Sequence, residues 1–160
     1  MRAAAGFLPI LLGLTTTARG AGYEMSLKVS DGQHERAATT QLSERHGPGQ
    51  SRLVLDGHAG AKFTATWKVA RSARDEAKDV LVHFYVVRIG RAGEAPPPLE
   101  PAKVAIESAL TMDFPHAEAS SATLQFKVEQ PGIYLVRVEA RPNSEEPGHE
   151  EYAAMDLVLK

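Results

Sequence analysis

The stretch ATLQFKVEQPGIYLVRVEA, residues 122–140, decides the fold class of this 160-residue chain. Its first half alternates apolar and polar side chains, so Leu124, Phe126 and Val128 fall on one face. A Pro-Gly pair at 131–132 predicts a tight turn, and the alternation resumes beyond it. Period-two alternation is typical of β-strands that place one face on a core. The stretch therefore predicts two successive strands joined by a turn.

The same alternation recurs along the chain and predicts an all-β protein. It marks Tyr23–Ser30, Lys62–Val69, Leu110–Phe114 and Tyr152–Leu159, with a short strand at Leu53–Leu55. Val80–Ile89 is apolar on both sides, which predicts a central strand with both faces covered. No stretch shows a helical period with caps, and residues 31–50 are polar and irregular. About eight or nine short strands separated by turn residues predict an antiparallel β-sandwich.

Residues 122–140 resemble the E-to-F strand region of bacterial immunoglobulin-like and PKD-like domains. The Pro-Gly turn followed by Tyr134, Val136 and Val138 carries this resemblance. It implies an Ig-like antiparallel β-sandwich in which the tyrosine hydroxyl bonds to nearby backbone. Lys62–Val69, with Trp67 pointing inward, is similar to a B strand of this fold. The resemblance implies a fold and does not imply an activity.

Residues 1–22 have the organisation of a secretory signal peptide. Arg2 provides a basic start, Ala3–Leu14 is apolar, and small residues follow, so cleavage fits after Gly20 or after Gly22. The apolar run is too short for a membrane-spanning helix. No cysteine follows it, which argues against a lipoprotein. We therefore expect a secreted or periplasmic mature domain of residues 23–160, with no stable membrane insertion after cleavage.

Composition narrows the classes of partner and chemistry. The chain has no cysteine, which excludes disulfides, zinc-cysteine sites and cysteine nucleophiles. Without Arg2 and Arg19 of the signal peptide, 16 of the 18 basic residues remain against 20 acidic ones, a formal charge of −4. Basic residues form no stripe, so no nucleic-acid partner is expected.

Motifs of known enzyme classes are missing from the sequence. It contains no G-x-S-x-G, no metalloprotease helix motif, no phosphate loop and no Rossmann fingerprint. Trp67 is the only tryptophan and is expected in the core, which leaves no stacking platform for a carbohydrate. We therefore expect a non-catalytic protein that acts in protein–protein or cell-envelope interactions.

The alternative function is binding of a divalent metal, copper or zinc. If each strand reverses direction, the loops at 31–50, 70–78, 115–121 and 141–150 share one end of the sandwich. Imidazole and carboxylate groups on such loops are ligands for these metals. The histidines of these loops are the candidate ligands: His34, His46, His116 and His149. The competing interpretation is a set of solvated loop residues with no common centre.

Two groups of strand residues are candidates for contact with a partner. His83 lies in the most apolar strand with Tyr85 on the same face, and is either a structural histidine or part of a binding face. Ile133, Leu135 and Tyr152 point outward if the inward sets are assigned correctly. They form either an exposed interface patch or a face covered by a loop or by the N-terminal strand. No cofactor is expected apart from the metal alternative.

Overall fold

The alternating segments form two β-sheets in the computed structural model. The structure describes residues 22–42, 52–71, 77–114, 119–141 and 151–160, so nearly all of the predicted signal peptide lies outside it. The described residues contain no α-helix, and therefore none that is long and apolar enough to cross a membrane. Their ten strands are β1 (Tyr23–Ser30), β2 (Glu35–Thr39), β3 (Gln41–Leu42), β4 (Val54–Gly57), β5 (Lys62–Arg71), β6 (Ala77–Ile89), β7 (Val104–Phe114), β8 (Ala119–Lys127), β9 (Gly132–Arg141) and β10 (Glu151–Leu159).

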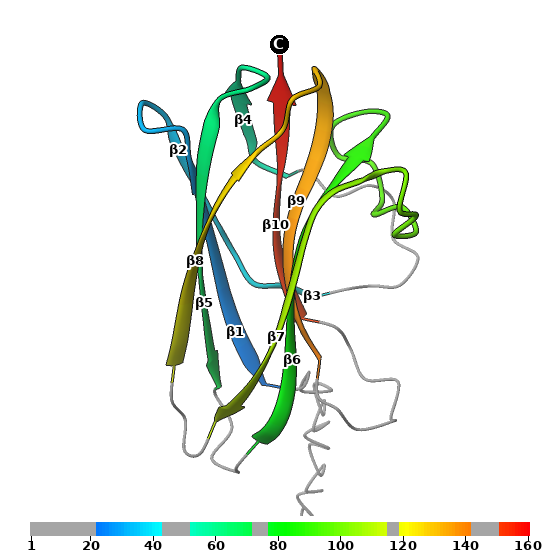
Figure 1. The fold of residues 1–160 in the computed structure, drawn as a ribbon. Coiled ribbons are helices and arrows are strands. Elements are labelled where there is room, and N and C mark those ends of the chain that lie inside the picture. Colours follow the sequence, from blue (N-terminus) through cyan, green and yellow to red (C-terminus); the bar gives the residue numbers. More distant parts are fainter. Residues whose placement is uncertain (1–21, 43–51, 72–76, 115–118, 142–150) are drawn as a thin grey trace, which may run out of the picture.

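The two sheets stack as a sandwich (Figure 1). The small sheet has the order β2-β1-β5-β8, and the large sheet has the order β3-β10-β9-β6-β7, with β4 also beside β10. All pairs are antiparallel except β4 with β10, which is parallel. β1 and β2 lie against β10 and β4 on one side of the sandwich. β8 and β7 are the edge strands on the other side.

The core lies between the sheets and has an aromatic row at its centre. Trp67 of β5 stacks on Phe84 of β6, with ring centroids 5.0 Å apart and planes 6° apart. Phe126 packs against Phe84 at 6.0 Å and against Phe63 at 5.5 Å. The predicted inward sets are confirmed: the inner residues of β9 and β10 are buried in this core, namely Tyr134, Val136, Val138, Ala153, Met155, Leu157 and Leu159.

Tyr134 makes the contact that the Ig-like resemblance implies. Its hydroxyl donates a hydrogen bond of 2.9 Å to the backbone carbonyl of Gln130, just before the Pro-Gly turn. The ring itself is buried at the start of β9. This hydrogen bond holds the start of β9 against the preceding turn. It confirms the expectation that the tyrosine hydroxyl bonds to nearby backbone.

Two details of the predicted strands are corrected by the structure. Residues 31–50, expected to be irregular, contain β2 and β3. Only Ala38 of β2 is buried, so the sequence of this strand does not alternate between apolar and polar residues. β7 begins at Val104, well before the predicted start at Leu110. The predicted fold class, an antiparallel β-sandwich of many short strands, is confirmed by the described residues.

The turn between β1 and β2 lies at the opposite end of the sandwich from its predicted place. Ser30 pairs with Thr64, whereas the far end of β5, at Ala70, pairs with Ala119. His34 is therefore at the other end from the loops that follow β5 and β7, and its predicted grouping with those loops is wrong. The prediction failed because β2 adds a strand that reverses the chain once more.

Asp31 holds this turn together. Its Oδ1 accepts hydrogen bonds from the backbone N–H groups of His34, at 2.6 Å, and Gln33, at 2.8 Å. These bonds favour the charged carboxylate and lower the pKa of Asp31 to about 2. The side chain thus stabilises the hairpin in its ionised form.

Candidate functional site

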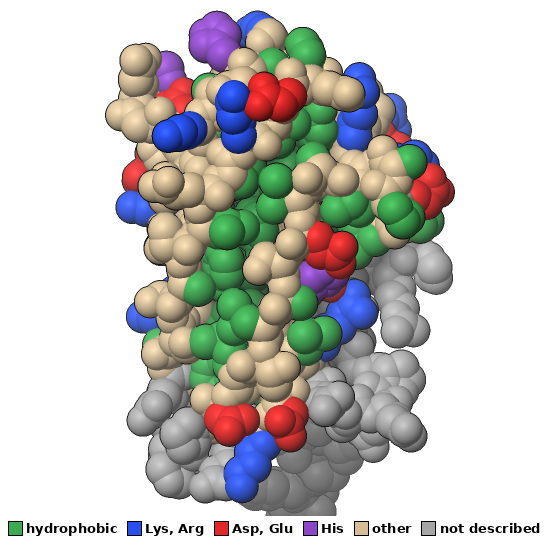
Figure 2. Space-filling view, viewed as in Figure 1, with side chains coloured by type: hydrophobic (Ala, Val, Ile, Leu, Met, Phe, Trp, Pro, Cys, Tyr) green, Lys and Arg blue, Asp and Glu red, His purple; other side chains and the backbone are tan. Residues whose placement is uncertain are grey.

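The edge formed by β7 and β8 leaves part of the core uncovered. Along β1 and β5 the core-facing side chains are almost fully buried, whereas along most of β7 and β8 they are only partly buried. Figure 2 shows the result as a continuous band of hydrophobic side chains along the molecule. We call this band the edge strip and define it by the partly buried apolar residues of the two strands: Ile106, Leu110, Met112, Ala122 and Leu124.

The sheet order explains the opening. β7 pairs with β6 and β8 pairs with β5, and no strand of the described residues pairs with their other edges. Several inward side chains are also small. Ser108 lies opposite Phe84 in the register, and Ala122 lies opposite Trp67. The aromatic rings behind these positions are buried, so the apolar surface that stays partly exposed is the edge strip itself.

A pocket of about 330 Å³ lies at one end of the edge strip, where β7 begins and β8 ends. Val104, Val128 and Tyr134 give it apolar walls. Its charged lining consists of three cations and one carboxylate, namely Arg88, Lys103, Lys127 and Glu129. We call it the edge pocket, and its excess of positive charge favours an anionic group.

The three cations differ in how their charge is balanced. Lys127 Nζ lies 2.8 Å from Glu129 Oε1, and Lys103 Nζ lies 2.9 Å from Glu100 Oε2. Both pairs are solvent-exposed, and such pairs contribute little to stability. Arg88 instead donates to two neutral acceptors, the Gln130 Oε1 at 3.4 Å and the Pro131 carbonyl at 3.5 Å. Within the described part of the chain its guanidinium has no carboxylate partner.

The absence of a side chain at Gly132 leaves space for the Arg88 guanidinium. A Cβ at this position would come within 3.3 Å of Arg88 Nε, and the backbone of Gly132 has φ +154°. The Pro-Gly pair read as a turn in the sequence therefore also leaves room for the guanidinium beside the edge pocket.

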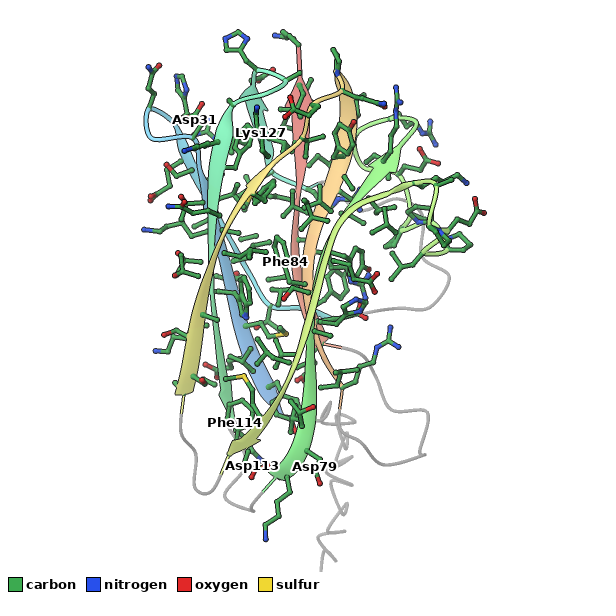
Figure 3. All side chains as sticks on the ribbon, viewed as in Figure 1. Asp31, Asp79, Phe84, Asp113, Phe114 and Lys127 are labelled. Carbon is green, nitrogen blue, oxygen red and sulfur yellow. The ribbon has the colours of Figure 1, made fainter. Side chains whose placement is uncertain are left out.

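The opposite end of the edge strip carries carboxylates. Asp113 lies near the end of β7, and its Oδ1 accepts a hydrogen bond of 2.9 Å from the backbone N–H of Asp79. Figure 3 places Asp79 and Asp113 at one end of the sandwich and Lys127 towards the other. Lys78 is next to Asp79 in sequence and is exposed. The strip thus runs from a cationic pocket to an end that carries two carboxylates, Asp79 and Asp113, and one lysine.

The structure brings the strand residues predicted for partner contact onto the outer face of the large sheet. Tyr85, Leu135 and Tyr152 belong to one cluster, and Ile133 packs against it. These three clustered residues are buried, at 4%, 0% and 7% exposure. Of the two interpretations left open, a covered face therefore describes them, and their role in binding a partner stays a prediction.

The segment between β6 and β7 is bonded to this outer face at Gly93 and Glu94. Asp156 of β10 is fully buried and accepts hydrogen bonds from Arg52 Nε, at 2.8 Å, and the Gly93 backbone N–H, at 2.7 Å. Arg52 also donates to the Glu94 carbonyl at 2.7 Å. These bonds fix the segment that leads into β7 and the edge pocket.

His83 belongs to a network of charges around Glu139, whose side chain is 1% exposed. Its Oε2 lies 2.9 Å from Arg137 Nη2. Its Oε1 lies 2.5 Å from Arg141 Nη2 and 3.5 Å from His83 Nδ1. His83 Nε2 bonds Glu107 at 2.8 Å on the other side of its ring. Arg137 also lies over the Tyr152 ring, 4.0 Å from its centroid. The two guanidinium groups compensate the charge of this buried carboxylate.

The predicted metal ligands are not brought together in the part of the chain that is described. His34 is bonded to Asp31, at 3.3 Å, and His46, His116 and His149 lie outside the described residues. His83 presents its two nitrogens to different carboxylates, so these three groups do not converge on one point. No group of three potential ligands occurs among the described residues. Metal binding stays a prediction.

Sequence reasoning missed the edge strip, Arg88 and the Glu139 network. The motif Arg137-Val138-Glu139 was the one available signal for the network, because it places opposite charges on one face of an apolar strand. Leu110 and Met112 look like any other core residues in the sequence. Their exposure follows from the sheet order, which alternation does not reveal.

Comparison with known proteins supports the fold. No protein-family model matches the chain, and no curated protein matches it. The C-terminal domain of Wzt is similar with a TM-score of 0.51 and 7% identity, over 89% of this chain and 76% of that one. The CARDB domain of a Pyrococcus furiosus protein has a TM-score of 0.44 and 9% sequence identity, and the match covers 87% of this chain and 98% of that domain. An AA10 lytic polysaccharide monooxygenase from Streptomyces lividans has a TM-score of 0.35 and 14% sequence identity, and the match covers 69% of this chain and 62% of that one. The likeness to the Wzt domain confirms the predicted fold, an immunoglobulin-like β-sandwich.

Proposed function

We propose that this chain is an exported, non-catalytic binding module that contacts another protein of the cell envelope through the edge formed by β7 and β8. The observation that carries the proposal is the edge strip, a continuous band of core-facing apolar side chains that stays partly exposed. Contiguous apolar surface of this kind marks interaction sites in soluble proteins.

The backbone of β7 adds a second reason. An edge strand offers a row of unpaired N–H and C=O groups, and natural proteins usually protect such edges with proline, lysine or a short strand length. β7 is 11 residues long, and its sequence VAIESALTMDF contains neither proline nor lysine. Its only charged residues are Glu107 and Asp113, and a long edge strand with so little charge favours pairing with a partner strand.

Export is part of the same proposal and rests on the signal-peptide pattern of residues 1–22. A cell-envelope partner follows from that location. The non-catalytic character rests on the missing catalytic motifs and on a candidate site built from apolar side chains and surface ion pairs.

Photocrosslinking in cells tests the proposal. A benzoylphenylalanine placed at Leu110 or Leu124 is expected to give adducts of defined mass, because both positions lie on the edge strip. The matched control is Lys68, an exposed position on the outer face of β5. Mass analysis of the protein from the same cells is expected to show cleavage after Gly20 or Gly22. The proposal is contradicted if Leu110 and Leu124 give no adducts, or if Lys68 gives adducts of the same masses.

A further inference from the structure

Building on the proposed function, we infer that the edge binds the extended C-terminal tail of a partner polypeptide. The tail pairs antiparallel with β7 and places its terminal carboxylate in the edge pocket. Three features support this inference: the length of β7, the side chains of the edge strip and the distribution of charge along it.

The edge strand has the length and shape of a template for strand addition. Eleven residues at about 3.3 Å each give an edge of roughly 36 Å. An added strand bonds to such an edge through its main chain, and every second side chain then points towards the core. The tail is therefore expected to alternate apolar and polar residues.

The inward side chains of the edge provide room for those apolar residues. Ile106, Leu110 and Met112 are apolar and only partly buried, and Ser108 lies among them. On β8, Ser120 and Ala122 face inward in the same way. Small residues between larger apolar ones leave positions that the side chains of an added strand can fill, which would complete the cover of the core.

Charge sets the direction of the tail. β7 runs from the cationic edge pocket to the carboxylates of Asp79 and Asp113, which outnumber the cation of the neighbouring Lys78. An antiparallel tail begins at the carboxylates and ends at the pocket. A basic residue at its start and a free carboxylate at its end would both meet opposite charges, whereas a parallel tail would reverse both contacts.

Arg88 is the group that would hold the terminal carboxylate. It is exposed, lines the edge pocket and bonds only neutral acceptors within the described residues. Guanidinium groups bind carboxylates through paired hydrogen bonds, which are stronger than bonds to neutral acceptors. The apolar walls of the pocket, from Val104, Val128 and Tyr134, suit the last side chain of the tail.

Peptide binding to the mature chain tests the inference. The probe is a nine-residue peptide that starts with lysine, alternates valine and threonine, and ends in a free carboxylate. Its control is the same peptide with a C-terminal amide. Trp67, the only tryptophan and the neighbour of Ala122 across the β5–β8 pair, reports binding by its fluorescence.

The carboxylate peptide is expected to bind about tenfold more tightly than the amide, since a charge-assisted pair is worth about 1.4 kcal/mol here. Arg88→Gln is expected to remove that difference, and the control variant Lys68→Gln, on the outer face of β5, is expected to keep it. A spin label on the first residue of the peptide is expected to broaden the NMR amide signals around Asp113.

Three results would overturn the inference and leave the proposed function to be judged by crosslinking alone. Equal binding of acid and amide contradicts carboxylate capture. Broadening around Lys103 instead of Asp113 contradicts the antiparallel direction. Crosslinks from the edge strip without any peptide binding contradict an extended tail as the occupant.

Discussion

Replacing Asp156 with alanine is expected to lower the free energy of unfolding by about 3–5 kcal/mol. The carboxylate is fully buried and accepts bonds from Arg52 and from the backbone of Gly93. Its removal leaves the Arg52 guanidinium, whose side chain is 4% exposed, without a counter-charge. A buried charge without a partner is among the most destabilising changes that one substitution makes. Chemical denaturation followed by circular dichroism measures the loss.

Asp56→Ala is the matched control. Asp56 lies on β4, which pairs with β10, and forms an ion pair of 3.3 Å with Lys160, but both side chains are about 70% exposed. Its removal is expected to cost less than about 1 kcal/mol. Equal losses at Asp156 and Asp56 would show that the buried pair does not hold residues 90–103 on the sheet.

Replacing Phe84 with alanine is expected to cost about 3–5 kcal/mol as well. Phe84 is fully buried at the middle of β6 and touches both Trp67 and Phe126, so its ring joins the two sheets. Loss of the ring removes apolar contacts and leaves a cavity beside Ser108, its neighbour on β7. Trp67 fluorescence is expected to change in the folded state, because its stacking partner is gone.

Leu81→Ala on the same strand is the control for Phe84. Leu81 lies on the outer face and is 37% exposed. Substitutions at such positions usually change stability by less than about 1 kcal/mol. A similar loss for Leu81→Ala would contradict the central place of the aromatic row in the core.

Much of the fold could be predicted because alternation reports which face of a strand is apolar. Tyr23–Ser30 and Lys62–Val69 were found from that pattern, and the Tyr134 hydroxyl bond followed from the Ig-like resemblance. β2 could not be predicted in this way, because only one of its residues is buried and its sequence does not alternate between apolar and polar side chains. The end at which His34 lies was consequently assigned wrongly.

The candidate site was harder to predict for a physical reason. Whether an inward residue is covered depends on the neighbours that its strand acquires, and sheet order is not encoded in the alternation of a single segment. Met112 and Met155 both sit in apolar alternation, yet Met155 is fully buried in a central strand and Met112 is only partly buried at an edge. Arg88 and Lys127 are far apart in sequence and meet at the edge pocket only after folding.

Amide hydrogen exchange along β7 tests the open edge most directly. In the isolated protein, the β7 amides that point away from β6 are expected to exchange rapidly, whereas the amides of β6 and β9 are protected. In the complex with the crosslinked partner, the same β7 amides are expected to become protected. Protection of these amides already in the isolated protein, or no change on complex formation, would contradict the account of β7 and β8 as the binding edge.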